Sequence, residues 1–295
     1  MLYSARDNLF MLLTALTNRG INLWCVTRFV QPLSANIARY ALPVGTVDIL
    51  RALLRSGTYT AATSLAAPSA VIDYGAATVL AGASVTVGVA GSYALVLESS
   101  DDNVNWVQRG TANWPSAAVG AKLGIETVDA VSAQYWRVRE TVLVANAFTS
   151  GTFVSAATVL PMSLLARDDY SSYPNPQSTN TQPLQAWYDK QSAFPYLQLW
   201  PAPNADGQQL VIWAQRQIQD VGALSNTIEV PQRWYLAIIF ELAKAIHLEL
   251  PKELVIEGRY QILKDEAERY TREAEDGERD GAPVRFSPNI SPYTR

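Results

Sequence analysis

The chain has 295 residues, of which 48% are hydrophobic, and this length suits one large domain or two ordinary ones. Its formal net charge is −4, so a broad basic surface for nucleic acid is not expected. A single cysteine, Cys25, excludes an internal disulfide framework, and a single histidine, His247, removes the usual metal-ligand and general-base sets. We therefore expect no catalytic residue, no metal site and no cofactor.

The first 56 residues predict a helix followed by strand-like segments. Leucines recur at helical spacing between residues 9 and 16, and the apolar stretch 21–31 is typical of strands. Pro43 and Gly45 mark a turn. A signal peptide is not expected, because Arg6-Asp7 interrupts the basic-then-apolar pattern that such a segment needs.

Residues 57–160 predict an inserted all-β domain. Small residues dominate this region, and alternating stretches such as Tyr93–Glu98 and Gln134–Glu140 are separated by turns. The uncharged stretch 74–97 is long enough to cross a membrane, but its glycines and its alternation favour strands. We predict a β-sandwich inserted at an exposed loop tip near residues 55–58.

The remaining chain predicts a small antiparallel meander and then a long helix. Strand candidates at 184–189, 196–200 and 209–216 are joined by turn-rich connectors. From Val230-Pro231 a helical pattern extends to about Gly277, with an apolar first half and a charged second half. The residues expected to form the core of the body are Trp234, Ile238, Leu242 and Ile246.

A proline-rich arm closes the chain at residues 281–295. Its prolines exclude a helix or a central strand, and it carries more apolar residues than a disordered end usually does. We therefore expect the arm to become ordered on a partner subunit. The residues expected to make that contact are Arg279, Pro283, Val284, Arg285, Phe286, Ile290 and Tyr293.

These elements predict an α+β fold class. It consists of a helical body with a small antiparallel β-meander, a long C-terminal helix and an extended C-terminal arm, plus an inserted all-β sandwich domain. The predicted domains are a discontinuous helical and β-meander body of residues 1–56 and 161–280, the inserted domain of residues 57–160, and the arm of residues 281–295.

The predicted β-domain leaves two alternatives open. Trp106 and Trp114 could stack against a sugar, although alternation with valines favours Trp106 as part of the core. Asp101-Asp102-Asn103 offers oxygen ligands for Ca²⁺, but the pattern is more typical of an ordinary polar turn. Hydrolase activity is disfavoured, because glycosidases need two carboxylates that face each other across a cleft, and pairs adjacent in sequence such as Asp168-Asp169 give no support for that geometry.

Several local patterns, in order along the chain, resemble one family. They resemble the head-to-tail adaptor, or connector, proteins of short-tailed bacteriophages over about residues 1–55 and 162–295. The segments that carry the resemblance are Tyr40-Ala-Leu-Pro-Val-Gly-Thr-Val-Asp-Ile49, Ala186-Trp-Tyr-Asp-Lys-Gln191, Tyr196-Leu-Gln-Leu-Trp-Pro-Ala-Pro203, Gln217-Ile-Gln-Asp-Val-Gly222, Val230-Pro-Gln-Arg-Trp-Tyr235 and Asp280-Gly-Ala-Pro-Val-Arg-Phe-Ser-Pro288.

The resemblance implies a non-enzymatic ring of twelve copies at the head–tail junction of a virion, assembled in the host cytoplasm. The C-terminal arm would bind the portal protein, and the distal face would receive tail nozzle or fibre proteins. DNA would pass through the channel without specific binding, and no membrane would be involved. Two rivals remain: a β-sandwich that binds host glycan on a virion anchor, and another tail-ring component such as a nozzle or tube protein.

Overall fold

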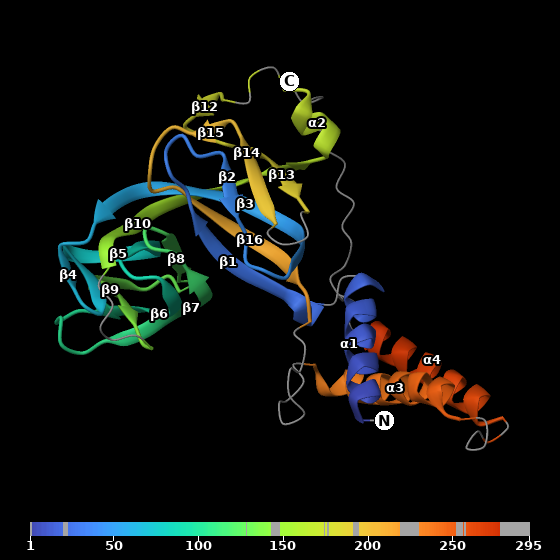
Figure 1. The fold of residues 1–295 in the computed structure, drawn as a ribbon. Coiled ribbons are helices and arrows are strands. Elements are labelled where there is room, and N and C mark those ends of the chain that lie inside the picture. The colour runs from blue at the N-terminus through green and yellow to red at the C-terminus, as the bar shows by residue number, and fades with distance from the viewer. Residues whose placement is uncertain are drawn as a thin grey trace, which may run out of the picture. The chain divides into compact units, whose positions relative to one another are not determined.

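The computed structural model describes residues 2–19, 23–127, 129–142, 148–173, 175, 177–190, 195–218, 230–251, 256 and 258–277 (Figure 1). The chain forms two compact units. One spans Val26–Arg216 and is named the β unit. The other combines Met1–Cys25 with Gln217–Arg295 and is named the helical unit.

A 10-stranded sheet dominates the β unit (Figure 1). Its pairings are antiparallel throughout, and β8 packs against both β1 and β7, so the sheet curls back towards its own first strand. In sheet order the strands are β1 (Val26–Pro32), β16 (Gln209–Arg216), β3 (Thr46–Ala61), β10 (Phe148–Pro161), β5 (Ser69–Val87), β9 (Ser132–Glu140), β6 (Gly91–Ser100) and β7 (Val107–Ala117), while β4 (Ser64–Ala66) and β8 (Lys122–Glu126) pair with β5.

Two smaller sheets complete the β unit. One has the order β11 (Ser163–Leu165), β13 (Gln185–Asp189), β14 (Tyr196–Trp200) and β2 (Arg39–Ala41), and the short helix α2 (Arg167–Ser171) packs against β13. The other pairs β12 (Thr179–Asn180) with β15 (Ala202–Pro203). The predicted meander is therefore split, because β16 leaves β13 and β14 to join the large sheet.

The β unit contains two hydrophobic cores. The buried residues of the first lie between Ala70 and Phe153, and those of the second lie in residues 33–54 and 162–214. The predicted domain boundaries at 56/57 and 160/161 fall inside β3 and β10, which run from one core to the other. The division into a body and an inserted domain stays a prediction.

The helical unit contains α1 (Leu2–Arg19), the 3₁₀ turns η1 (Leu23–Cys25) and η2 (Gln232–Trp234), α3 (Tyr235–Glu249) and α4 (Arg259–Gly277). Helix α3 packs against both α1 and α4, and the rings of Phe240 and Tyr270 stack with their centroids 5.2 Å apart. Among the described helices, none is both long enough and apolar enough to cross a membrane. The buried core residues of the unit are Leu13, Leu16, Cys25, Ile218, Val230, Trp234, Ala237, Ile238 and Ala274.

The predicted fold class is wrong, because strands make up 51% of the described residues and helices 24%. The β-strands form the main body. The expected long C-terminal helix is two helices packed on each other, since Pro251 drives Leu250 into an extended conformation (ψ 141) and ends α3. Gly258 (φ 79) then adopts a left-handed conformation immediately before α4 begins. The predicted arm, residues 281–295, lies outside the described residues.

Candidate functional site

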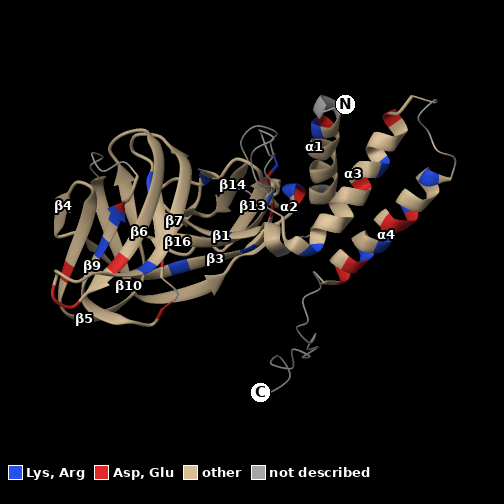
Figure 2. Ribbon diagram, turned by 90° about the horizontal axis from the view of Figure 1, so that it is seen from below, with Lys and Arg blue, Asp and Glu red and all other residues tan. Residues whose placement is uncertain are grey.

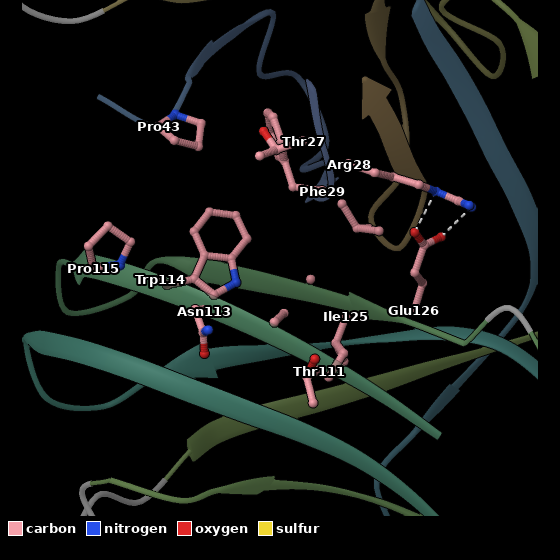
Figure 3. A pocket seen from close by; sticks show the side chains of 13 residues that line it. Thr27, Arg28, Phe29, Pro43, Thr111, Asn113, Trp114, Pro115, Ile125 and Glu126 are labelled. Atoms are coloured by element: carbon pink, nitrogen blue, oxygen red, sulfur yellow. Dashed lines mark hydrogen bonds and ion pairs between the residues drawn. The ribbon is translucent and has the colours of Figure 1, made fainter. Parts of the chain in front are cut away.

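A cavity of about 310 Å³ lies between β1, β7 and β8 (Figure 3). Its volume falls at the lower end of the roughly 300–1,000 Å³ typical of small-molecule sites. The lining comes from Thr27–Val30 of β1, Thr111–Pro115 of β7, Gly124–Glu126 of β8, and Pro43. These segments are far apart in sequence, so only the curled sheet creates the site.

Two glycines allow β8 to fit between its neighbours. A Cβ atom at Gly124 would lie 2.6 Å from the carbonyl oxygen of Val30 on β1. A Cβ atom at Gly110 on β7 would lie 2.1 Å from the carbonyl oxygen of Glu126. Both distances are shorter than any tolerable contact, so a larger residue at either position would push a wall of the cavity outwards.

One end of the cavity holds a carboxylate shared by two guanidinium groups. Arg28 Nε lies 2.7 Å from Glu126 Oε1, and Arg55 Nη2 lies 2.6 Å from Glu126 Oε2. Arg55 also donates a hydrogen bond of 3.4 Å to Oε1 of Gln209. The Arg55 side chain is only 6% exposed, whereas Arg28 is 36% exposed. The cluster carries two positive charges and one negative charge, so one positive charge is left uncompensated.

The ring of Trp213 holds two arginines at this positive end of the cavity. The guanidinium carbon of Arg28 lies 4.7 Å from the ring centre of Trp213 on β16, and that of Arg51 on β3 lies 5.7 Å from the same centre. Such stacking holds cations in place on an aromatic face. The result is a fixed cluster of arginines beside the cavity.

Trp114 forms the opposite wall of the cavity. Figure 3 shows its indole standing on β7, with Pro115 on one side and the Arg28–Glu126 pair on the other. The ring is half-buried and packs against the first core, and its Nε1 has no acceptor among the described residues. Asn113 and Thr111 on the same strand are exposed. The sequence-based role of Trp114 as a glycan contact stays a prediction.

Trp106, the other predicted glycan contact, does not line this cavity. It is half-buried, and the guanidinium carbon of Arg137 lies 4.1 Å from its ring centre. Arg137 therefore occupies one face of the ring. The two tryptophans are not brought together around a single site.

Glu98 pairs with Arg137 and Arg139 next to Trp106, and this charged cluster makes the free energy of unfolding depend on pH. Burial raises the pKa of Glu98, but hydrogen bonds from Arg139 and Arg137, together with their charges, outweigh burial and lower that pKa below 4.5. The unfolded state therefore takes up a proton first as the pH falls. The stabilisation from Glu98 is complete above pH 4.5 and is lost as the pH falls through the folded-state pKa.

We expect Glu98→Gln to lower the melting temperature near neutral pH and to lower it progressively less below pH 4.5. Circular dichroism melts of both proteins across this range measure the difference. Melting temperatures that differ by a constant amount at every pH would contradict the assignment.

The segment Asp101-Asp102-Asn103, which the sequence offered as a possible Ca²⁺ ligand, forms a turn. Asp102 Oδ1 accepts hydrogen bonds from the backbone N–H groups of Val104 and Asn105 and from Ser100 Oγ. These bonds, with the Asn105 backbone first, hold the pKa of Asp102 well below its usual range. Within the described part of the chain, no group of three or more His, Cys, Asp or Glu side chains could hold a metal ion.

The residues predicted as the core of the body lie at the start and along one side of α3. Trp234 and Ile238 are buried, whereas Leu242 and Ile246 are half-buried. The residues predicted to contact a portal lie outside the described part of the chain; they are Arg279, Pro283, Val284, Arg285, Phe286, Ile290 and Tyr293.

Helix α3 also presents an apolar surface to solvent. Tyr235, Leu236 and Ile239 are 45%, 49% and 57% exposed. Leu242 and Ile246 continue the same side at helical spacing. We name these five residues the α3 face. By contrast, Figure 2 shows acidic and basic residues along α4, which is the charged second half of the predicted helical run.

The cavity residues that sequence analysis missed are Arg28 and Glu126. They are 98 positions apart and give no local signal of their pairing. The only hint is a charged residue within each of two otherwise strand-like runs, which is also typical of a solvent-facing strand position. By contrast, Trp114 could be singled out because a tryptophan is rarely without a packing or binding role.

No family model and no curated protein matches the sequence. The C-terminal domain of a chitobiase from Bacteroides fragilis is 19% identical, with a TM-score of 0.24 over 30% of this chain and 64% of that chain. A family 89 glycoside hydrolase from Clostridium perfringens, in complex with 2-acetamido-1,2-dideoxynojirmycin, is 15% identical, with a TM-score of 0.26 over 44% of this chain and 14% of that chain. A two-domain protein with unknown function from Bacteroides fragilis is 11% identical, with a TM-score of 0.20 over 45% and 47%. The chain spans less than two thirds of the length of each, and likenesses this weak carry no argument about function.

Proposed function

We propose that this chain is a structural virion protein that forms an oligomeric ring, connects the capsid portal to the tail and extends the DNA exit channel. The observation that carries the proposal is the α3 face. A helix that is apolar on all sides is normally covered on all sides, but Tyr235, Leu236 and Ile239 are open to solvent in a single chain. In a ring, the neighbouring copy covers such a surface.

The segments that resemble the adaptor family support the proposal, because three of them form one structural element. Strand β14 pairs with both β13 and β2. The hydroxyl of Tyr188 donates a hydrogen bond of 2.8 Å to the carbonyl oxygen of Thr46, and Lys190 Nζ lies 3.1 Å from Asp48 Oδ2. Three of the six segments that carry the resemblance therefore lie side by side in the β unit.

The proposed role needs neither catalysis nor a cofactor. The carboxylate in the cavity, Glu126, is held by two arginines and is not placed to transfer protons. The net charge of −4 suits a channel through which DNA slides. Twelve copies, the portal contact of the C-terminal arm and the nozzle or fibre contact of the distal face are part of the proposal.

Deleting residues 281–295 is expected to abolish binding to the portal while leaving the ring intact, because the arm is proposed to serve only the portal contact. Co-sedimentation of the purified chain with the purified portal ring of the same virion measures the binding, and sedimentation velocity measures the ring. A linker of glycine and serine of the same length, in place of 281–295, is the matched control for tail length.

Portal binding that survives the deletion would overturn the role of the arm. A ring that binds the tail nozzle but no portal would favour the rival tail-ring component over the adaptor.

A further inference from the structure

We propose that the cavity between β1, β7 and β8 binds an acidic saccharide, with Trp114 as its stacking surface and Arg28 as the partner of its carboxylate. The site lies wholly in the β unit. The proposal goes beyond the ring function, which rests on the α3 face. Either can fail without the other.

The lining has the chemistry that a sugar ring requires. A pyranose presents one apolar C–H face and an edge of hydroxyl groups. The half-buried ring of Trp114, flanked by Pro43 and Pro115, can cover the apolar face. Thr27 of β1 also lines the cavity and brings a hydroxyl group that can accept a hydrogen bond.

The charge of the cavity selects an acidic sugar over a neutral one. Glu126 neutralises only one of the two arginines that bind it. Arg51 adds a third positive charge beside Trp213, and no acidic partner for it is found in the described part of the chain. An anion entering this end of the cavity is attracted by the unbalanced charge.

Exposure identifies Arg28 as the group that the ligand reaches. Its side chain is 36% exposed, and that of Arg55 is 6% exposed. Arg55 therefore stays with Glu126 and Gln209 when Arg28 turns towards a ligand carboxylate. Arg28 can then form the paired hydrogen bonds that guanidinium and carboxylate groups favour.

The same lining disfavours nucleic acid. Phosphate backbones are bound by several cations spaced along a groove, whereas the far wall here consists of Trp114 and two prolines. The ligand expected is therefore compact and has a single negative charge per ring.

The test titrates the full chain with trigalacturonate and with galactotriose, its neutral counterpart, using isothermal calorimetry at low salt. We expect trigalacturonate to bind at least about tenfold more tightly, since a charge-assisted hydrogen bond distinguishes the two. Trp114→Ala and Arg28→Gln should each weaken trigalacturonate binding by about tenfold or more. Arg28→Gln keeps the Arg55–Glu126 pair, so it should remain folded.

Two variants outside the cavity are the matched controls. Trp106→Phe alters a tryptophan that does not line the cavity, and Lys122→Gln removes a cation that pairs with Asp206 instead. Both should bind trigalacturonate normally. Absence of binding to the unaltered chain, binding that survives both cavity substitutions, or equal binding of a triglutamate peptide that responds to the same substitutions would overturn the proposal.

Discussion

Replacing Glu126 with glutamine will lower the free energy of unfolding by about 3 kcal/mol, because it removes the charge that pairs with a buried arginine. Arg55 is 6% exposed, and among the described residues Glu126 is its one charged partner. The glutamine amide can still accept one hydrogen bond, but it cannot compensate the guanidinium charge. The loss in free energy of unfolding should therefore exceed the loss caused by neutralising one partner of a surface ion pair.

Chemical denaturation of the full chain, followed by tryptophan fluorescence, measures this loss. Asp206→Asn is the matched control, because it removes the charge of a carboxylate that is 67% exposed and pairs with Lys122. That exposed pair should contribute less than about 1 kcal/mol. Equal losses in the two variants would show that the Glu126 cluster does not hold β8 in place.

The second large effect concerns assembly. Ile239→Glu is expected to weaken each contact between copies by about 2 kcal/mol or more, which is roughly 30-fold in affinity, because it places a charge in the centre of the α3 face. Ile239 is 57% exposed in the single chain, so the fold itself should tolerate the change.

Sedimentation velocity over a range of concentrations measures the assembly of this variant. Val104→Glu is the control, since it adds the same charge at a residue that is 76% exposed in the turn after β6. The account expects Val104→Glu to assemble normally. If the Ile239→Glu variant assembles at the same concentrations as the unaltered chain, the α3 face is not part of the interface between copies.

Local periodicity predicted individual strands but not the sheet that they form. The alternating residues 93–98 and 134–140 lie in β6 and β9, and the candidates at 184–189, 196–200 and 209–216 contain β13, β14 and β16. What alternation cannot specify is the partner of a strand. The pairing of β16 with β1 and β3 joins segments from opposite ends of the β unit, so β16 was wrongly placed in a small meander.

The helical error has a different cause, because its signal was present in the sequence. Pro251 and Gly258 both interrupt the run that was read as one helix, and the structure ends α3 before the first and begins α4 after the second. The apolar pattern on either side of the break outweighed these two residues in the prediction. The pattern correctly indicated helices, but not their number.

One part of the candidate site could be predicted from the sequence and another part could not. Trp114 was identified from its residue type alone, but the charged partners of the cavity depend on the contact between β1 and β8. That contact exists because Gly124 lets the backbone of β8 approach Val30, and such an approach between distant segments leaves no periodic trace. The unbalanced charge of Arg28, Arg55 and Glu126 could be recognised only after the strands were placed.

Electron-microscopy class averages of the purified full chain, alone and mixed with the portal of the same virion, test the ring proposal most directly. The account predicts closed rings with a central channel, which stack end-on against the portal. Particles the size of single chains, with no ring and no portal complex at any concentration, would contradict it.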